Sequence, residues 1–498
     1  MTISVPNGHH TGTSPRRELS AAERRIWFDR SRTRAGSDSG ILCSVVSFDG
    51  LPDVSRLHEA MAGVWRRHEV LTSTHHVGPD GEPYRMRSEV EPEWIEHDLT
   101  ALDPAAAERR IDVVRQRLAA RPFELADQAP LRVAVLRVDA DRHVMIVAAH
   151  AIAWDDDSLG ILLHDVASEL DNRAHTIDSA PTATSGIGAT DIGFWQTELA
   201  DLPDAALNPR AQNPMTPGPA ASGESVTATI DVDPALLCAA DEFARRRRMS
   251  LVDVLLAAHS AFMLRCSGIT DLVTTVPAAT IAARTLAAHT PMSRAPIGQY
   301  GNAMLVRSHP DPGATFDDQV SAVAATLDRV ARHLDDGLDD VLEATRPARG
   351  AHGLTRVSRV GFAVHPAVPA PGPVVSAASH AGAATIRVIR ADRPKPPVPW
   401  HLAVELDGIR PQVRMTMTGS DAESATETGR RYLTLLAGAI AEPATTLGRL
   451  PLLPPEWRDA VLAAAYGPRA SHPPTTLCAV VERIVATRPP VSYTHLTL

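Results

Sequence analysis

The hydrophobic and polar pattern is most informative where an apolar run of β-forming residues, 144–149, meets a cluster of polar side chains. The run ends in His150, and the aspartates from Asp155 to Asp157 are followed by Ser158 and a helix-like apolar pattern. A short apolar run bounded by polar residues is typical of a buried strand, and a polar residue before a periodic apolar segment marks a helix start. We therefore expect a strand that delivers a histidine and carboxylates to the beginning of a helix, an arrangement suited to chemistry.

Before this stretch the pattern predicts alternating helices and strands. Ser20, with Glu23 three residues later, forms a capping-box pattern and predicts a helix start. Asp103 followed by proline predicts another. The β-rich runs 131–138 and 143–149, joined by a short polar turn, predict a hairpin. The remaining elements predicted here are a strand over 41–48 and helices over 55–69 and 104–120.

The composition changes over residues 176–223, which are rich in Ala, Pro, Thr, Ser and Gly and predict a linker with one short helix around 194–199. A second set of elements follows, with a loop-like stretch over 278–295. Its predicted strands cover 225–232, 272–276, 303–306, 359–364, 385–389, 401–406 and 412–418, and its predicted helices cover 234–247, 251–266, 316–346 and 422–441. This order suggests two α+β lobes of similar size joined by a linker.

Length and composition indicate an ordinary globular protein with more than one core, because 498 residues include 44% hydrophobic and 22% charged residues. The net charge of −10 argues against nucleic acid as a partner, since phosphate binding needs clustered Lys and Arg. The one basic run, Arg245–Arg248, falls in a predicted helix, and we expect it to be a solvated face.

Targeting signals and cysteine motifs are missing from the pattern. The four cysteines are scattered without a CxxC, which favours neither a zinc site nor a disulfide framework and suggests a reducing compartment. Residues 1–17 lack the apolar core of a signal peptide, and no run approaches the roughly 18 apolar residues of a membrane span. We expect a cytoplasmic protein with no membrane partner.

The polar cluster resembles the HHxxxDG signature of the condensation domains of nonribosomal peptide synthetases. In HAIAWDD, His150 matches the first histidine, Ala151 stands at the second, Asp155 matches the aspartate and Asp156 replaces the glycine. Seven further motifs follow the family's order over roughly residues 18–455. They are LSAAERRIWF (19–28), RHEVLTSTH (67–75), PFELADQAPLRVAVLR (122–137), ATDIGFW (189–195), IGQYGNAMLVR (297–307), HLDDGLDDVLEA (333–344) and LGRLPLLPPEWRDAVLAAAYG (447–467).

The resemblance implies an α+β fold of two chloramphenicol-acetyltransferase-like lobes in a V with a central tunnel. It implies that donor and acceptor carrier proteins thread phosphopantetheine-linked substrates to the middle, that the domain itself binds no cofactor, and that an adenylation domain follows. We therefore expect a disordered terminus (1–17), an N-terminal lobe (18–175), a linker (176–223), a C-terminal lobe (224–446), a linker with the start of a truncated adenylation domain (447–490), and a non-native tail (491–498).

The resemblance assigns catalysis to the second histidine, which assists attack by the acceptor amine, and here Ala151 stands in its place. A methyl group can neither accept a proton nor hydrogen-bond. His150 is poorly placed to substitute, because adjacent strand residues point to opposite sides. The motif aspartate, Asp155, is expected to hold the loop by pairing with an arginine, for which Arg284 and Arg294 are the candidates.

The other candidate residues have a structural interpretation beside the functional one. Asp156 and Asp157 fit an acidic helix N-terminus, and no second ligand cluster supports a metal site there. Asn302 could line the tunnel or cap a strand end. The residues that the resemblance places along the substrate tunnel are Trp154, Asp156, Ser158, Tyr300 and Asn302.

Two functional hypotheses remain open. The first is an acyltransferase that forms an amide between carrier-bound substrates, with activity impaired at Ala151. The second is a non-catalytic platform of the interface type, which recruits a tailoring oxygenase or hydroxylase to carrier-bound substrates. Such relatives share the lost second histidine and the paired aspartates, here Asp155 and Asp156. A domain kept only for architecture is a third possibility.

Overall fold

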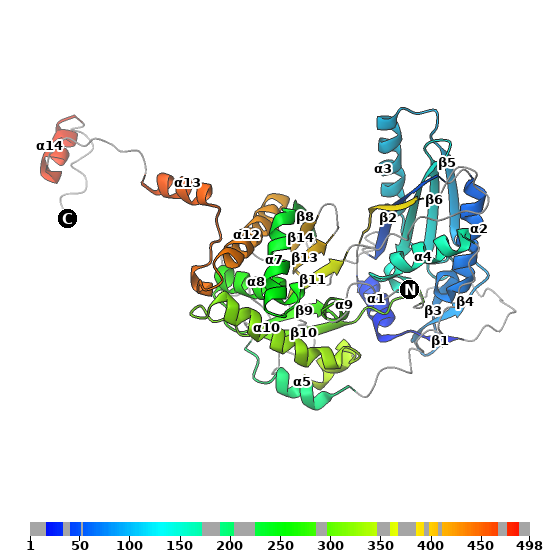
Figure 1. Cartoon of the computed structure of the whole chain (residues 1–498), viewed down its shortest axis with the longest axis horizontal. Coiled ribbons are helices and arrows are strands. Elements are labelled where there is room, and N and C mark those ends of the chain that lie inside the picture. Colours follow the sequence, from blue (N-terminus) through cyan, green and yellow to red (C-terminus); the bar gives the residue numbers. More distant parts are fainter. Residues whose placement is uncertain are drawn as a thin grey trace. The chain divides into compact units, whose positions relative to one another are not determined.

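The computed structural model describes residues 16–32, 40–50, 53–171, 190–203, 225–284, 296–345, 359–366, 385–392, 398–406, 411–466 and 476–487 (Figure 1). The chain divides into two compact units, Met1–Leu450 and Pro451–Leu498. Among the described residues, the first unit contains all the strands, and the second contains the helices α13 (Pro455–Tyr466) and α14 (Leu477–Thr487).

The strand that ends in His150 lies in the middle of a five-stranded sheet with the order β12-β2-β7-β6-β5. This strand, β7, pairs antiparallel with β2 and β6, which confirms the predicted hairpin, whereas β5 runs parallel to β6. The bounds are β2 (Ile41–Asp49), β5 (Glu93–Asp98), β6 (Leu131–Arg137), β7 (Arg142–His150) and β12 (Thr385–Arg390).

Both faces of β7 are buried, which explains its continuous apolar sequence. Val144, Ile146 and Ala148 belong to a core shared with α3 (Pro104–Ala120). The alternate residues Met145, Val147 and Ala149 belong to a second core shared with α2 (Val54–Arg67) and α4 (Ser158–Leu170). Figure 1 accordingly shows α3 on one side of the sheet and α2 and α4 on the other. The helix cap at Asp103 is confirmed, since its side chain accepts from the backbone of Ala106.

The predicted first helix is confirmed as α1 (Ala21–Arg32), and its capping box is formed. The Ser20 N–H donates to the Glu23 carboxylate at 2.7 Å, and the Glu23 N–H donates to the Ser20 hydroxyl at 3.2 Å. Next to it stands a three-stranded sheet, which the sequence pattern did not predict, with the order β1-β4-β3. Its strands are β1 (Arg17–Glu18), β3 (Ser73–Val77) and β4 (Pro83–Arg87). Arg85 of β4 also pairs with Glu23 at 2.7 Å.

The second large sheet has six strands in the order β10-β9-β11-β13-β14-β8. Its central strand, β11, runs parallel to both β9 and β13, and the other pairs are antiparallel. The strands are β8 (Ser225–Asp231), β9 (Leu272–Pro277), β10 (Ala303–Ser308), β11 (Val360–Pro366), β13 (Trp400–Leu406) and β14 (Gln412–Thr418), and the main helices are α7 (Pro234–Arg246), α8 (Leu251–Ser267), α10 (Phe316–Val330) and α12 (Ala422–Ala441). The predicted strands of this half and its helices over 234–247, 251–266 and 422–441 are therefore present, with small shifts at their ends.

Two predictions in this half are wrong. The expected helix over 316–346 is divided into α10, a 3-10 turn over 331–333 and α11 (Leu338–Ala344). The break is held by distant residues, because the Trp195 indole donates to the Asp336 carboxylate at 2.7 Å and the Asn302 amide donates to the carbonyls of Leu334 and Asp336 at 2.9 and 2.7 Å. The stretch expected to be a loop over 278–295 begins with a short helix, α9 (Ala278–Ala282), and its residues 285–295 lie outside the described ones.

The predicted linker of residues 176–223 is described only over 190–203, which contain the expected short helix as α5 (Ile192–Glu198). The range expected to form the second lobe also serves the first sheet, because β12 pairs with β2 as its edge strand. The tail expected at 491–498 lies outside the described residues.

None of the helices in the described part of the chain is long and apolar enough on its own to cross a membrane, and the bent pair of α7 and α8 meets the length and composition test only together.

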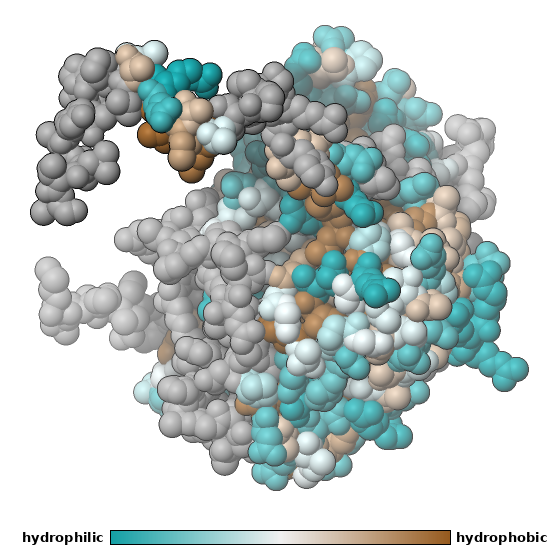
Figure 2. Space-filling view, turned by 90° about the vertical axis from the view of Figure 1, so that its left-hand side faces the viewer, coloured by the Kyte–Doolittle hydropathy of each residue, from teal (hydrophilic) through white to brown (hydrophobic). Residues whose placement is uncertain are grey.

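In the second unit several apolar side chains are exposed, and Figure 2 shows brown, hydrophobic residues on a short segment between grey ones. The exposed apolar residues of this unit are Trp457, Val461, Leu462, Leu477, Val481 and Ile484.

Candidate active site

His150 is the last residue of β7 and is almost fully buried, at 1% exposed. Its N–H donates to the Pro130 carbonyl at 2.9 Å, and its Nδ1 accepts the N–H of Ile152 at 3.1 Å. A ring nitrogen that accepts an N–H carries no proton, so this contact requires a bare Nδ1. The ring also meets Phe123 edge-on, with 5.9 Å between centroids. His150 thus shapes the turn that follows the strand.

Ala151 begins that turn, a 3-10 helix over Ala151–Ala153, and its methyl group lies in the core of the first sheet. Its N–H donates to the Gly40 carbonyl at 2.7 Å. Its carbonyl accepts from the side-chain amide of Gln299 at 3.0 Å, which joins the turn to the second half of the chain. The backbone at this position is therefore held on both sides, while the side chain has no polar atom to offer a substrate.

Asp155 accepts hydrogen bonds from hydroxyl and backbone donors, whereas the resemblance implies an arginine partner. One carboxylate oxygen accepts both the hydroxyl and the N–H of Ser158, at 2.6 and 3.1 Å, which fixes the start of α4. The other oxygen accepts the backbone N–H of Tyr300 at 3.1 Å. Burial raises the pKa of Asp155 to about 6, opposed by the Ser158 and Tyr300 hydrogen bonds and supported by the neighbouring charges of Asp157 and Asp156.

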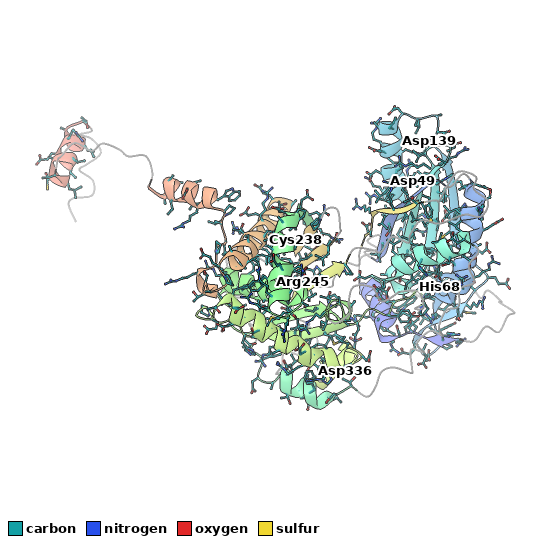
Figure 3. The ribbon with its side chains drawn as sticks, viewed as in Figure 1. Asp49, His68, Asp139, Cys238, Arg245 and Asp336 are labelled. Atoms are coloured by element: carbon teal, nitrogen blue, oxygen red, sulfur yellow. The ribbon has the colours of Figure 1, made fainter. Side chains whose placement is uncertain are left out.

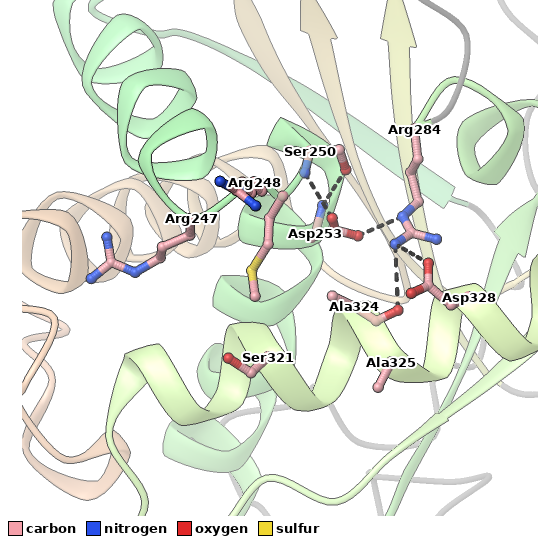
Figure 4. Close-up of a pocket in the computed structure, with 10 residues that line it drawn as sticks. Arg247, Arg248, Ser250, Asp253, Arg284, Ser321, Ala324, Ala325 and Asp328 are labelled. Carbon is pink, nitrogen blue, oxygen red and sulfur yellow. Dashed lines mark hydrogen bonds and ion pairs between the residues drawn. The ribbon is translucent and has the colours of Figure 1, made fainter.

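The structure excludes Arg284 as the partner of Asp155. Its guanidinium pairs with Asp253 at 2.5 Å and with Asp328 at 2.8 Å, and it also donates to the Ala324 carbonyl at 3.3 Å. These contacts line a cavity of about 500 Å³ between the start of α8 and α10 (Figure 4). Two carboxylates already surround this arginine, so Asp155 takes backbone and hydroxyl donors instead. The other candidate, Arg294, lies outside the described residues.

A second histidine, which the sequence analysis did not single out, positions the segment opposite the motif. Nδ1 of His68 accepts the N–H of Ile297 at 3.0 Å, and Nε2 lies 2.7 Å from the Asp165 carboxylate, so that Nε2–H donates to it. His68 is labelled in Figure 3. His68 and Asp165 are both buried. The sequence did contain a signal for this pair, because His68 belongs to the RHEVL motif and Asp165 is a charged residue in the apolar helix α4.

The remaining predicted residues separate into two groups. Tyr300 and Ser158 join the motif, since Tyr300 donates its N–H to Asp155 and the Ser158 hydroxyl also lies 3.3 Å from the Gly298 carbonyl. Burial raises the pKa of the Tyr300 phenol, whose side chain is nonetheless exposed at the surface. Asn302 and Trp154 lie elsewhere: Asn302 is bonded to the 334–336 turn, and Trp154 is buried in the core of the first sheet.

Asp156 makes a contact that the helix-terminus interpretation did not include. Its Oδ2 lies 3.5 Å from Nδ1 of His365, the next-to-last residue of β11. The motif loop therefore contacts the second half of the chain through four residues of the described part, Ala151, Asp155, Asp156 and Ser158.

A family model described as the condensation domain matches residues 16–358, which is more than half of the chain. The chain belongs to the condensation-domain family. Among curated relatives, one of the plipastatin synthase polypeptides of Bacillus subtilis is 25% identical over 343 residues, covering 66% of this chain and 13% of the relative. A probable nonribosomal peptide synthetase of Salinispora arenicola is 25% identical over 504 residues, covering 95% of this chain and 6% of the relative. This condensation domain thus spans only a small part of the curated relatives it matches.

Solved structures agree on the fold. The first condensation domain of the CDA synthetase aligns with a TM-score of 0.66 and 20% identity, covering 89% of this chain and 100% of that one. A four-domain nonribosomal peptide synthetase bound to AMP and glycine aligns with a TM-score of 0.72 and 16% identity, covering 95% of this chain and 36% of that one. The expected α+β fold of the chloramphenicol-acetyltransferase type is confirmed.

The candidate site is therefore a tightly held loop, in which Ala151 stands where the resemblance implies the second histidine of the motif. Hydrogen bonds fix His150, Ala151 and Asp155, and they fix residues 297–300 of the facing segment. Such an arrangement can orient substrates and exclude water. Proton transfer at position 151 is excluded by chemistry, so any base must come from another residue or from solvent.

Proposed function

We propose that this condensation domain joins a carrier-bound acyl or peptidyl donor to a carrier-bound aminoacyl acceptor through an amide bond. The observation that carries the proposal is the intact framework of the motif loop, in which Asp155 binds both the start of α4 and the Tyr300 backbone. A decayed site would have no reason to keep a half-buried carboxylate fully hydrogen-bonded, because such a group is costly to bury.

The reaction does not strictly require an imidazole at Ala151. The acceptor amine attacks the donor thioester carbon, the C–N bond forms, the C–S bond breaks, and the proton lost by the amine ends on the thiolate. General-base assistance contributes about 10²–10⁴-fold in rate. An α-amine has a pKa of about 7.7–8.0 and is partly unprotonated near neutral pH. Alignment of two tethered substrates can supply effective molarities of about 10⁵ M or more. We therefore expect slowed transfer rather than none.

The partners follow from the same proposal. Donor and acceptor carrier proteins bring their substrates on phosphopantetheine arms, so the condensation domain needs no cofactor of its own. An adenylation domain downstream would load the acceptor carrier. The apolar residues exposed on α13 and α14 fit a segment that packs against such a neighbouring domain.

A platform that recruits a tailoring oxygenase or hydroxylase is the second candidate function. The loss of histidine at Ala151 and the pair Asp155–Asp156 favour it, because relatives of the interface type share both departures. This role requires direct binding of a purified oxygenase encoded in the same gene cluster, and it requires no acyl transfer.

A single-turnover assay read by intact mass tests the proposal. The wild type and the Ala151→His variant are mixed with the carrier proteins encoded in the same gene cluster, loaded with an acyl donor and an aminoacyl acceptor. Transfer by the wild type supports amide formation. Transfer by Ala151→His alone would show a competent scaffold with a silenced site and would sink the proposal, as would transfer by neither protein when loading is confirmed.

A further inference from the structure

The segment 297–300 is hydrogen-bonded to the first half of the chain at each of its four residues. Backbone N–H groups make the bonds at its two ends, and a carbonyl and a side chain make the two between them. The bonds join the Ile297 N–H to His68, the Ser158 hydroxyl to the Gly298 carbonyl, the Gln299 side chain to the Ala151 carbonyl, and the Tyr300 N–H to Asp155. The position of this segment is therefore set by its partners in the first half.

His68 is the one of these partners that lies outside the motif loop, as the C-cap residue of α2. Its ring is buried, and its Nδ1 accepts the Ile297 N–H at 3.0 Å. A backbone N–H can only donate, so Nδ1 carries no proton. Nε2 lies 2.7 Å from the Asp165 carboxylate and donates its proton there. Both ring nitrogens of His68 are thus used, one on each neighbour.

The surroundings of Asp165 select this state of the ring. Asp165 is buried on the apolar helix α4, and a buried carboxylate is costly without donors and a compensating charge. Arg67 supplies that charge from 3.5 Å and also pairs with Glu169. A carboxylate only accepts hydrogen bonds, so it favours the His68 tautomer with the proton on Nε2 and the lone pair on Nδ1. The charged groups of α2 and α4 thus prepare an acceptor for a backbone N–H.

The helix α4 holds both ends of the segment. It begins at Ser158, whose hydroxyl lies 3.3 Å from the Gly298 carbonyl, and it carries Asp165 two turns later. Seven helical residues advance about 10 Å along the axis, and three steps of extended chain span at most about 10 Å. The segment therefore fits alongside the first two turns of α4. A displacement at the Ile297 end would be transmitted to the Tyr300 end, because both ends are anchored to one rigid element.

We propose that His68 is a positioning residue of this condensation domain, which holds the segment 297–300 against the motif loop in the geometry that transfer needs. The inference rests on the proposed amide-forming function. Gln299 bonds the Ala151 carbonyl, so the backbone of the motif loop follows the segment. Since Ala151 offers no base, alignment of the substrates is the contribution that remains to this loop. Alignment is sensitive to position, because a displacement of about 1 Å can cost about 10²-fold in rate.

Two substitutions of His68 separate the roles of its two ring nitrogens. In His68→Asn the side-chain oxygen takes the place of Nδ1 and can accept the Ile297 N–H, but the Asp165 carboxylate loses its donor. In His68→Gln the side-chain nitrogen takes the place of Nε2 and keeps the bond to Asp165, but the Ile297 N–H loses its acceptor. Hydrogen bonds to charged groups contribute more to stability than those between neutral groups. We therefore expect His68→Asn to be the less stable variant in urea unfolding.

Single-turnover transfer, measured on the full chain with the same loaded carriers, should follow the opposite order. We expect His68→Gln to slow transfer by about 10-fold or more. It should also speed amide hydrogen exchange at both Ile297 and Tyr300, although Asp155, the acceptor of Tyr300, is unchanged. His68→Asn should keep the protection of both amides and most of the wild-type rate. His58→Gln, at an exposed histidine of the same helix, is the control and should match the wild type.

Three outcomes overturn the inference. If the wild type transfers and the rates of the variants follow their stabilities, with His68→Asn the slower, the histidine only supports the fold. If His68→Gln speeds exchange at Ile297 alone and keeps the wild-type rate, the bond is local and positions nothing. The proposed function stands in both cases. If the wild type itself does not transfer with loaded carriers, the proposed function fails and the inference falls with it.

Discussion

At the scale of single residues, the Asp155 carboxylate combines burial with three hydrogen bonds, and these act on its pKa in opposite directions. Burial is the larger effect and raises the pKa from 3.8 to about 6. The folded protein therefore holds a proton on this group between about pH 4 and 6 that the unfolded chain releases, so ionisation of Asp155 lowers stability as the pH rises through that window. The same carboxylate is needed to bind Ser158 and the Tyr300 backbone.

The variant Asp155→Asn tests this balance. The lost acceptor lowers the stability of the variant by an amount that does not depend on pH. The difference in free energy of unfolding, variant minus wild type, should nevertheless rise by roughly 1–3 kcal/mol between pH 4 and pH 6.5, because the variant has no charge to bury. Urea unfolding at several pH values measures it. Asp98→Asn is the control, since hydrogen bonds from Thr100 lower the pKa of Asp98 and the relative stability should change in the opposite direction. A flat difference for Asp155→Asn would contradict the account.

At the scale of elements, the break between α10 and α11 shows how distant residues override a helical pattern. Residues 316–346 carry a helix-like sequence, yet the chain turns at 331–337. The Trp195 indole from α5 donates a hydrogen bond to the side chain of Asp336. The Asn302 amide beside β10 donates to the carbonyls of Leu334 and Asp336. The ring of Phe194 also stacks on His333, with 3.8 Å between centroids. The α5 helix is thereby fixed on the second lobe.

Trp195→Phe keeps most of the ring and removes only the buried N–H donor to Asp336. We expect it to lower the free energy of unfolding by about 1–3 kcal/mol, because a buried acceptor loses its partner. Trp94→Phe is the matched control: its indole donates to Glu96 in an exposed hydrogen bond, and its loss should cost about 0.5 kcal/mol or less. Equal losses in the two variants, measured by urea unfolding, would mean that the α5 contact contributes nothing specific.

At the scale of the whole molecule, the sequence predicted those parts of the fold that local patterns determine. The hairpin of β6 and β7, the capped helix α3 and the last helix α12 were predicted almost to the residue, since apolar periodicity and capping residues act within a few positions. The short strands β3 to β5 were missed because they are half-polar. The pairing of β12 with β2, across more than 300 residues, has no local signal.

The candidate site was predictable to the same extent. The motif located the loop from His150 to Ser158, and the resemblance assigned Asp155 to holding it. The predicted partner of Asp155, an arginine, was wrong, because a hydrogen bond from the backbone N–H of Tyr300 has no sequence signature. The contact between Asp156 and His365 was missed for a similar reason, since only the fold brings β11 to Asp156.

Two buried histidines of the second lobe make the whole molecule sensitive to acid. Burial, and after it the charge of His401, lowers the pKa of His259 to about 3, and the pKa of His401 is lowered to about 3 as well. Both rings are neutral in the folded protein, whereas the unfolded chain protonates them near pH 6.5. Stability is therefore full above pH 6.5 and falls as the pH drops toward 3, by on the order of 1 kcal/mol for each histidine and pH unit.

His259→Phe tests this sensitivity, because its ring nitrogens have no hydrogen-bond partner among the described residues and its neighbours Phe362 and Trp400 are aromatic. The variant should be at least as stable as wild type at pH 7.5 and should lose stability less steeply between pH 6.5 and 4.5. His309→Phe, at an exposed position, should keep the wild-type slope. An unchanged slope in His259→Phe would show that this histidine is protonated in the fold.

The most direct test of the central claim, that the loop around Ala151 still supports amide formation, is the single-turnover rate of the wild type beside that of Ala151→His. With both carriers loaded, we expect amide product from the wild type at a rate no more than about 10⁴-fold below that of the variant, the upper range of a lost general base. Product from the variant with none from the wild type, under conditions that would detect this rate, would contradict the claim and leave the platform role as the better account.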